Sequence, residues 1–330
     1  MISKINRRRM LALTGLASSH LLSPLHAQTT PTAYPSKPIK IVITFPPGGS
    51  ADTMARTLSD RLSVIMKQSF VIDNKPGAGG GIGAVSVAKA ANDGYTLLMG
   101  VAGAMSINPS LYKNLSYDPI QDFSPISLIG KSPIVLVASS TVADNSVSDL
   151  IAKAKLKPEE LTYASTGNGT IHHLTGEMFC DRSKIKMTHV PYSGTTQALQ
   201  DVISGRVPYG FLDLTLALPL IGNGRIKGLA TSGLSRSSAS PNIPTIAETG
   251  ITGFDTNGWF GLFAPKGTPK NIIELINSNT RSILETQEFK LVASNVAVDA
   301  VSSSPQELSN FLKSEIEKWK KVIIDANVTV

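Results

Sequence analysis

The chain has 330 residues, 42% of them hydrophobic and 17% charged, which is the composition of a globular protein with room for two domains of ordinary size. Four of its 31 basic residues and none of its 24 acidic residues precede position 28, so the formal charge of +7 falls to +3 for the remainder, with 27 bases against 24 acids. No basic tract is interleaved with aromatic residues, so nucleic-acid binding has no support.

The first 27 residues read as an export signal. The basic run Arg7–Arg9 precedes the weakly apolar stretch Met10–Leu25, and the small residue Ala27 follows. A twin-arginine signal and an ordinary secretory signal both fit this pattern. An uncleaved membrane anchor is the alternative, although the stretch is short and is interrupted by serines and Pro24. We therefore expect cleavage near Ala27 and a periplasmic location.

Strands and helices alternate from Ile39 onward, a pattern that predicts parallel sheets built of βα units. The first helix is expected from Ser50 to Met66, with Met54, Leu58, Leu62 and Ile65 on one face. A second helix is expected from Ile82 to Ala91, and the apolar run GYTLLMGV after it predicts a fully buried strand.

Two long extended stretches interrupt this alternation. The first runs from Ser124 to Ser140 and is followed by a predicted helix at Val147–Lys155, which begins a new βα series. The second runs from Gly253 to Pro265 and precedes two predicted helices with a short strand between them, at Pro269–Thr286 and Pro305–Ala326. Two crossings that enclose a middle segment predict a discontinuous first domain into which a second domain is inserted.

Four times a strand runs through a glycine- or proline-marked loop into a helix, within residues 39–56, 70–90, 161–179 and 187–203. Each unit delivers unpaired backbone N–H groups at a helix N-terminus, where the helix dipole also favours negative charge. Two units come from the first part of the chain and two from the middle. Lys75 is the one cation in the loops, so the pattern predicts an anion held between two lobes by main chain.

In the first two loops, the sequence predicts that the side chains have structural roles and that the backbone contacts the ligand. Ser50 is the expected N-cap of its helix, and Asp52 is expected to support the helix through Arg56 at i,i+4, which leaves the N–H groups of Gly49–Ala51 for a ligand. The second loop matches a permissive dinucleotide fingerprint at Gly79-x-Gly81-x-x-Ala84, but no acidic residue ends the next strand to hold a ribose, so we expect no cofactor. Its glycines let a ligand approach closely, and a flexible turn alone is the alternative.

The third and fourth loops carry hydroxyls, amides and nearby histidines. His173 and Glu177 stand at i,i+4, but only two metal ligands are in reach and His189 is expected elsewhere, so we predict hydrogen-bonded histidines and no metal. The fourth loop is expected to cap a helix at Gln197–Ile203 with a hydroxyl. Asp213 ends a strand, where it could receive an ammonium group or cap the following turn.

Catalysis finds little support. The chain has no G-x-S-x-G elbow, and the Ser183-x-x-Lys186 match lies in a polar segment that reads as a surface loop. The single cysteine, Cys180, excludes an intrachain disulfide and is expected to be a buried small hydrophobe. We expect no catalytic residue. An exported hydrolase or lyase using His173 or Asp213 is the enzyme alternative.

Seven ordered segments resemble the periplasmic substrate-binding receptors of the tripartite tricarboxylate transporter family, the Bug-type receptors. The resemblance spans the chain after the signal. The segments are YPSKPIKIVITFPPGGSADTMAR, DNKPGAGGGIGA, ANDGYTLLMG, YASTGNGTIHHLTGEMF, HVPYSGTTQAL, IPTIAETGITGF and WFGLFAPKGTP. The resemblance implies an α/β protein with a type II periplasmic-binding-protein fold, in which two βα lobes are joined by two crossover strands with a ligand cleft between them. Residues 28–127 and 254–330 would form lobe 1, and residues 128–253 lobe 2.

The resemblance also implies that main-chain N–H groups and ordered waters hold a carboxylate in the cleft. Ser193 stands where relatives often have a basic residue, which leaves the substrate open. The expected ligand-binding residues are Pro47, Gly48, Gly49, Ser50, Ala51, Asp52, Gly79, Gly80 and Gly81 on lobe 1, and Ser165, Gly167, Asn168, Gly169, Thr170, Ser193, Gly194, Thr195 and Asp213 on lobe 2.

The sequence thus predicts a monomeric extracytoplasmic receptor that binds a small carboxylate, closes on it and delivers it to integral-membrane transporter subunits. Di- and tricarboxylates, amino acids and aromatic acids are all open as ligands. A sensory receptor module for a membrane kinase shares the expected fold and is a further alternative.

Overall fold

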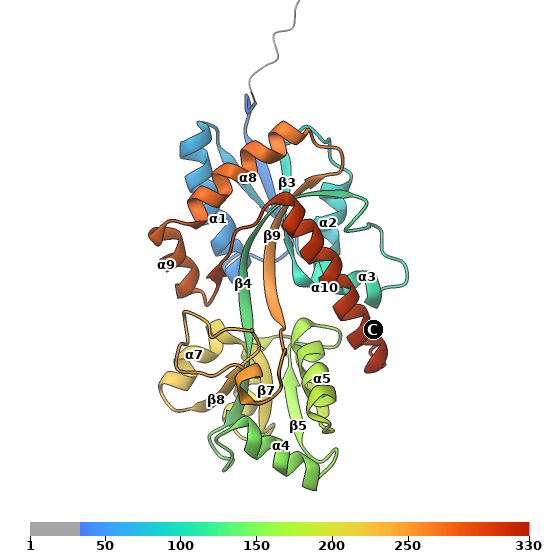
Figure 1. Ribbon diagram of the computed structural model, residues 1–330, viewed down its shortest axis with the longest axis vertical. Helices are drawn as coiled ribbons and strands as arrows, with labels where there is room; N and C mark the ends of the chain where they lie inside the picture. The colour runs from blue at the N-terminus through green and yellow to red at the C-terminus, as the bar shows by residue number, and fades with distance from the viewer. Residues whose placement is uncertain (1–33, 330) are drawn as a thin grey trace, which may run out of the picture. The chain divides into compact units, whose positions relative to one another are not determined.

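The computed structural model describes residues 34–329, which form strands and helices around two β-sheets that share one long strand (Figure 1). The predicted export signal and its cleavage near Ala27 lie outside the described residues. Within residues 34–329, no helix combines the length and the apolar character needed to cross a membrane.

The first sheet has a parallel part and an antiparallel part. Strand β1 (Ile39–Ile43) lies between β2 (Phe70–Asn74) and β3 (Thr96–Val101), and the three run parallel. Strand β9 (Asn257–Pro265) pairs antiparallel with the other edge of β3. As predicted, β3 is buried along nearly its whole length, because strands in the interior of a parallel sheet are covered on both faces.

Strand β4 (Phe123–Ser139) carries the chain from the first sheet to the second. Its first part pairs with β9 and with the short strand β10 (Asp299–Ala300), and its part from Ile134 onward pairs with strands of the second sheet. The chain returns just before β9, where the Thr256 N–H donates to the carbonyl of Ser232 at 2.9 Å. Both extended stretches predicted from the sequence are therefore crossings between sheets.

The second sheet repeats the parallel arrangement. Strand β5 (Thr162–Ser165) lies between β6 (Thr188–Pro191) and β7 (Tyr209–Asp213), all parallel, and β7 and β8 (Ile226–Thr231) pair antiparallel with β4. Because β5, β6 and β7 are parallel, their carboxyl ends share one edge of the sheet. The third and fourth loops follow β5 and β6 at that edge.

The helices mostly begin and end near their predicted bounds. They are α1 (Ser50–Met66), α2 (Gly81–Ala88), α3 (Asn108–Leu111), α4 (Val147–Leu156), α5 (Ile171–Ser183), α6 (Thr195–Ile203), α7 (Leu214–Gly222), α8 (Lys270–Leu284), α9 (Gln287–Asn295) and α10 (Pro305–Asp325), with short turns η1 (Ala78–Gly80), η2 (Gly103–Ile107) and η3 (Ala247–Thr249). Helix α2 ends three residues earlier than expected, and α9 was not predicted. Met54, Leu58 and Leu62 are buried as predicted, whereas Ile65 is exposed in the last turn of α1.

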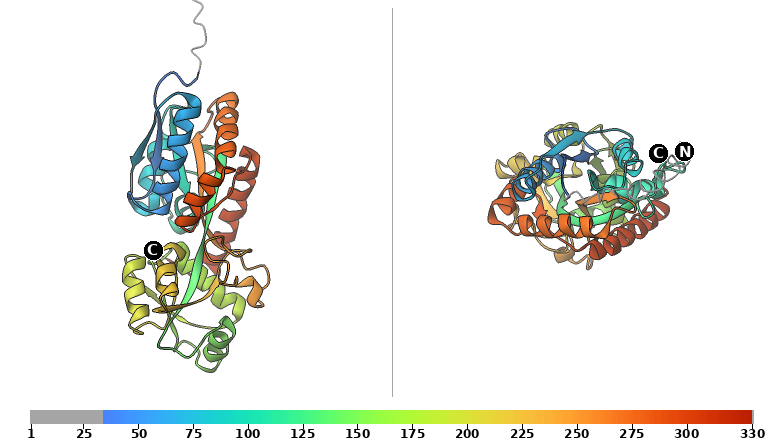
Figure 2. Two further views of the ribbon diagram at one scale, coloured as in Figure 1. Left: turned by 90° about the vertical axis from the view of Figure 1, so that its left-hand side faces the viewer. Right: turned by 90° about the horizontal axis from the view of Figure 1, so that it is seen from above.

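Helix α10 contacts elements of both sheets (Figures 1 and 2). It packs on β4, η2 and α3, and its C-terminal half contacts α5. Trp319, Val322 and Ile323 belong to the same buried cluster as Tyr163 and Phe179 of the second sheet and its helices. The last helix in the sequence therefore completes the core of a segment that ends far earlier in the chain.

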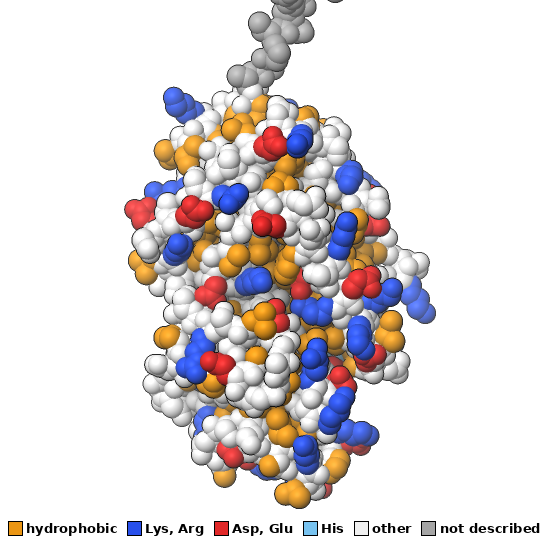
Figure 3. Space-filling view, viewed as in Figure 1, with side chains coloured by type: hydrophobic (Ala, Val, Ile, Leu, Met, Phe, Trp, Pro, Cys, Tyr) orange, Lys and Arg blue, Asp and Glu red, His pale blue; other side chains and the backbone are white. Residues whose placement is uncertain are grey.

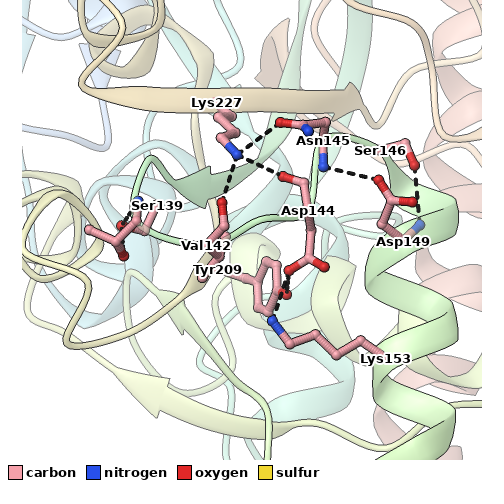
Figure 4. A network of polar contacts seen from close by, with 10 residues as sticks. Ser139, Val142, Asp144, Asn145, Ser146, Asp149, Lys153, Tyr209 and Lys227 are labelled. Carbon is pink, nitrogen blue, oxygen red and sulfur yellow. Dashed lines mark hydrogen bonds and ion pairs between the residues drawn. The ribbon is translucent and has the colours of Figure 1, made fainter.

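A polar network fixes the end of the second sheet at which β7 begins (Figure 4). The Asp144 carboxylate accepts from Tyr209 at the first position of β7 and from Lys153 of α4, the latter at 3.0 Å. Lys227 of β8 donates to the backbone carbonyls of Val142 and Asp144 at 2.7 and 3.1 Å. Asp213 ends the same strand about 13 Å away, at a rise of ~3.3 Å per residue.

Candidate functional site

The first loop is organised by the carboxylate of Asp52. This side chain is nearly buried and accepts from the Gly48 N–H at 3.0 Å, from Arg56 at 2.9 Å and from Asn74 at 3.0 Å. Burial alone would raise the pKa of Asp52, but the hydrogen bond from Arg56 and those from Gly48 and Asn74 outweigh it and lower the pKa. The expected helix support by Asp52 is confirmed, and the Gly48 N–H is hydrogen-bonded within the loop.

The predicted cap of α1 is wrong in one respect. Gly49, with φ −82° and ψ 174°, is the N-cap, and Ser50 is the first helical residue. No side chain caps this helix. The first-turn N–H groups at Ser50 and Ala51 therefore have no intrahelical acceptor, as holds for the start of any α-helix.

The first and second loops are brought together. Asn74, the last residue of β2, donates to the Phe45 carbonyl at 3.1 Å as well as to Asp52. A Cβ atom at Gly80 would lie 3.1 Å from the Cβ of Thr44 at the end of β1 and 3.0 Å from that of Ala104. A side chain at Gly80 would therefore be crowded, and it would also be strained because φ is 91° here, so the second loop lies directly against Thr44 after β1 and Ala104 of the π-helical turn η2.

The backbone of the second loop turns through the left-handed region. Gly77, Ala78, Gly79 and Gly80 all have positive φ, between 48° and 119°. Glycine adopts such angles at no steric cost, whereas Ala78 does so at some cost in strain. Asn108 holds the turn by donating to the Gly79 carbonyl at 3.2 Å. The glycines therefore have a structural role in the turn, beside any contact with a ligand.

Two stacked histidines lie behind the third loop, and the expectation that His189 lies elsewhere is wrong. The rings of His173 and His189 stack at 3.8 Å between centroids and 9° between planes. His173 Nδ1 accepts from the Gly169 N–H at 3.1 Å, and His189 Nε2 lies 2.6 Å from Ser165 Oγ. Adjacent parallel strands bring His189 of β6 beside Tyr163 of β5, a pairing that linear spacing does not reveal.

Burial is the largest influence on the pKa of His189. Burial and the neighbouring His173 lower the pKa of His189 to about 4. Burial works to raise the pKa of Glu177, but hydrogen bonds from His173 and Tyr163 outweigh it, and its pKa is lowered. Burial and Glu177 raise the pKa of Tyr163, and burial raises that of Cys180 to about 12. The predictions of hydrogen-bonded histidines and of a buried Cys180 are thus confirmed. Among the described residues, no group of three or more possible ligands could hold a metal.

Asp213 joins the third and fourth loops. Its Oδ1 lies 3.1 Å from His172 Nε2, and its Oδ2 accepts from the Thr195 hydroxyl. The other nitrogen of the His172 ring, Nδ1, lies 2.7 Å from the Thr166 hydroxyl. Asp213 stands at the N-cap position of α7 but makes no side-chain cap, so the capping alternative is wrong. The carboxylate instead ties the end of β7 to both loops.

The Asp213 carboxylate is held ionised. Burial works to raise its pKa, but the charge of His172 and the hydrogen bonds from His172 and Thr195 outweigh burial and lower the pKa to about 2. The Asp213 side chain is 46% exposed, so one part of it faces solvent while its two oxygens are bonded to the loops. An ionised group in this position contributes negative charge beside a predicted anion site.

The fourth loop differs from its predicted form. Helix α6 begins at Thr195, two residues before the expected start, and its N-cap is Gly194 without a side-chain cap. The predicted hydroxyl cap is therefore wrong, because the Thr195 hydroxyl is bonded to Asp213. Ser193 donates its N–H to Gln197 at 3.3 Å. Tyr192 donates its N–H to the Ser165 carbonyl at 3.1 Å, so the third and fourth loops lie side by side.

The predicted site residues thus form two groups. One consists of the first two loops at the ends of β1 and β2, and the other of the last two loops with Asp213 at the ends of β5, β6 and β7. Sequence reasoning missed residues that hold these loops in place without belonging to them. These residues are Thr44, Asn74, Ala104, Asn108 and His189.

Two surface hollows lie apart from most of these loop residues. The larger, of about 480 Å³, lies between the end of α5, the start of β6 and the end of α10, and none of the four loops lines it. Its rim is charged, with Lys186 paired to Glu159 at 3.0 Å and Lys321 to Asp325 at 2.5 Å, and Figure 3 shows Lys and Arg side chains gathered on this side. A second hollow, of about 400 Å³, borders the second loop.

Comparison with known proteins places the fold in one class. The structure resembles "R. palustris Rpa4515 with adipate", with a TM-score of 0.78 and 34% identity, covering 90% of this chain and 99% of that chain. It also resembles the periplasmic binding protein BugD (TM-score 0.74, 31% identity, 90% and 99% covered). MatC (Rpa3494) from Rhodopseudomonas palustris with bound malate is similar at a TM-score of 0.73 and 29% identity, with 88% and 100% covered.

Two α/β lobes joined by crossover strands, with glycine-marked loops at the strand ends, define a periplasmic-binding-protein fold and a solute-binding receptor. The sequence model of the protein family described as "Tripartite tricarboxylate transporter family receptor" matches residues 54–328 of this chain. The chain belongs to this family, whose members are periplasmic substrate-binding receptors that work with membrane transporter components and are not enzymes. The predicted resemblance and fold class are confirmed.

Proposed function

We propose that the protein is an exported receptor that binds a small carboxylate between its two lobes and delivers it to the membrane subunits of a transporter. The observation that carries the proposal is the pair of loop groups, in which backbone N–H groups stand at the starts of α1, α5 and α6. A carboxylate accepts several hydrogen bonds, and helix N-termini favour its negative charge. Two relatives, one with adipate and one with malate, support this class of ligand.

We propose the lobe boundaries that the sequence predicts, with residues 28–127 and 254–330 in lobe 1 and 128–253 in lobe 2. Each lobe contributes two of the four loops, so a ligand held by both groups would have donors that neither lobe supplies alone. Binding then favours the closed arrangement by the difference in affinity between the two states. The mature chain is proposed to be a periplasmic monomer.

The ionised Asp213 narrows the choice of ligand. A carboxylate placed against its exposed edge would be repelled, whereas an ammonium or a hydroxyl group would be attracted. We propose that the ligand's carboxylate lies against the helix N-termini and that any second polar group near Asp213 is a hydrogen-bond donor. An α-amino or hydroxy acid fits this arrangement better than a ligand with anionic groups at every end.

The test is a series of melting-temperature shifts for the mature chain with mono-, di- and tricarboxylates, hydroxy acids and amino acids. A shift with one or more carboxylates is expected, because a ligand that binds only the folded state raises its stability by mass action. Sugars and simple cations serve as controls. Shifts with these controls and none with any carboxylate would overturn the proposal. Retention of unchanged ligand distinguishes a receptor from an enzyme.

A further inference from the structure

Both glycine N–H groups of the third loop are engaged away from any ligand. The Gly169 N–H donates to His173 Nδ1 at 3.1 Å, and the Gly167 N–H donates to Ser165 Oγ at 3.1 Å. Ser165 Oγ in turn lies 2.6 Å from His189 Nε2. Both glycine amides therefore trace back to the stacked rings of His173 and His189, one directly and one through a serine hydroxyl.

The geometry fixes where the protons of His173 lie. Because Nδ1 accepts a hydrogen bond from a backbone N–H, it carries no proton, and the ring proton is on Nε2. That nitrogen faces the carboxylate of Glu177 at 3.5 Å. Glu177 also accepts from the Tyr163 hydroxyl at 2.6 Å. A ring protonated at both nitrogens has no acceptor left for the Gly169 N–H.

The other groups that face the stack come from each element packed around it. Tyr163 is on β5, and Glu177 and Cys180 are on α5, which also carries His172 on the side toward Asp213. Lys318 of α10 lines the surface hollow that Glu177 also borders. Glu177 thus places a carboxylate beside the two imidazoles, where its charge can balance one added proton on the stack.

The loop leaves other donors to a ligand. Asn168 is exposed between the two glycines, and the N–H groups of Ile171 and His172 open helix α5, where no intrahelical acceptor exists. Gly167 and Gly169 have φ of +122° and +70°, which glycine adopts without steric cost, so the two hydrogen bonds and not steric limits hold this conformation. The two anchored amides determine where the free ones point.

We propose that His173 and His189 are positioning residues, whose neutral stacked rings hold residues 165–170 in the ligand-binding conformation and release them when the stack is protonated. Their contact with a ligand is indirect, through the loop. The proposal rests on the proposed carboxylate function for the identity of the ligand, but the state of the rings and of the loop amides can be measured without one.

The first test reads the rings in the ligand-free mature chain. Of the five histidines in the sequence, His20 and His26 precede the expected cleavage near Ala27, so three signals remain in a ¹⁵N-histidine spectrum. We expect His173 to carry its proton on Nε2 with an unprotonated Nδ1 at pH 7. A proton on Nδ1 at that pH would overturn the proposal.

The second test separates the acceptor from the ring. His173→Phe keeps an aromatic ring on His189 but removes the acceptor, whereas His173→Asn loses the ring and can keep an acceptor near the Nδ1 position. We expect the Gly169 amide to lose hydrogen-exchange protection in His173→Phe and to keep part of it in His173→Asn. Tyr163→Phe is the control, since it removes the hydroxyl's bonds to Glu177 and to the His173 carbonyl and leaves both loop bonds in place.

Binding of the carboxylate that gives the largest melting shift completes the test. We expect His173→Phe to weaken it about tenfold, equivalent to ~1.4 kcal/mol, and Tyr163→Phe to leave it nearly unchanged at equal or greater loss of melting temperature. Equal weakening in both variants would reduce His173 to a structural role and overturn the proposal. If no carboxylate binds the wild type, the proposed function fails while the ring and amide measurements still decide this proposal.

The pH profile is the third readout. In the wild type, protection of the Gly167 and Gly169 amides, corrected for intrinsic exchange, is expected to fall as the histidine signals titrate. The loss of amide protection and the titration of the His173 and His189 signals should have the same midpoint pH. Loop amides that stay protected through the titration of both rings would contradict the proposal.

Discussion

The first and third loops use the same local bond with different acceptors. In each, a glycine N–H donates to the side chain four residues later, from Gly48 to Asp52 at 3.0 Å and from Gly169 to His173 at 3.1 Å. Asp52 is a carboxylate partnered by Arg56, whereas His173 is an imidazole stacked on another. Two glycine-bearing loops thus depend on acceptors of different chemistry, one a carboxylate and the other an imidazole.

The two loops should differ in how they respond to a fall in pH. The pKa of Asp52 is lowered, so the first loop keeps a charged acceptor until the pH falls below the ordinary range of an aspartate. The pKa of His189 is about 4, below that of a free histidine, because burial opposes its charge. At a pH where a free histidine would already be protonated, protonation of the buried His189 costs free energy in the folded protein. The third loop bears this cost because the stacked rings of His173 and His189 hold it. We therefore expect acid to weaken the third loop before the first.

The largest expected effect is the acid dependence of stability itself. Between pH 6.5 and 4 the unfolded chain binds a proton at His189 and the folded chain does not, so the free energy of unfolding falls as pH falls, by up to about 3 kcal/mol. Urea unfolding at a series of pH values measures it. His189→Gln should flatten the curve in this window, and a wild type whose stability is constant from pH 7 to 4 would contradict the prediction.

A substitution in α5, the helix that follows the third loop, should have the next largest effect on stability. A Cβ atom at Gly176 would lie 2.4 Å from the ring of Tyr163, which is buried and bonded to Glu177. We expect Gly176→Ala to destabilise the protein by about 2 kcal/mol through overpacking. Gly222→Ala in α7 is the matched control, because no atom lies within 4 Å of its added Cβ. Equal melting temperatures for the two variants would disprove the tight contact.

Removal of the acceptor in the first loop should have a smaller effect. Asp52→Ala breaks hydrogen bonds from Gly48, Arg56 and Asn74, and we expect a loss of about 1.5 kcal/mol. Since the folded pKa is lowered, this contribution is present at neutral pH and disappears as pH falls through that pKa. Denaturation of the variant and wild type at pH 7 and pH 3 measures both parts. The two should differ less at pH 3.

The fourth loop should show the smallest effect. Ser193 donates to Gln197 at 3.3 Å, again four residues later, but the acceptor is neutral and the bond is exposed. We expect Gln197→Ala to cost about 0.5 kcal/mol or less. Melting curves of the variant provide the measurement. A loss as large as that of Asp52→Ala would show that charge and burial do not rank these bonds.

Much of the fold could be predicted from hydrophobic patterning. The buried strand β3, the crossings at β4 and β9 and the bounds of α1 all follow from runs of apolar residues and their interruptions. Helix α9 was missed because its pattern is weak and it follows α8 after a two-residue interval. The N-cap at Gly49 was missed because Ser50, a better capping residue by type, stands next to it.

The site was predicted in its loops and not in what holds them. Glycines and helix starts can be read locally, whereas the pairing of His173 with His189 depends on which strands become neighbours in the sheet. The same holds for His172 with Asp213, which lie 41 positions apart. The sequence suggests Asp213 as an ammonium receptor or a cap. It does not reveal the two loop partners of Asp213, because sequence spacing carries no information on them.

The packing of α10 has a consequence for the order in which the protein can be assembled. Trp319, Val322 and Ile323 close the buried cluster around Tyr163 and Phe179, yet they follow the middle segment by some sixty residues in the sequence. The interior of that segment therefore lacks one wall until α10 has packed against it. Folding of the protein should end with a late, cooperative step that depends on α10.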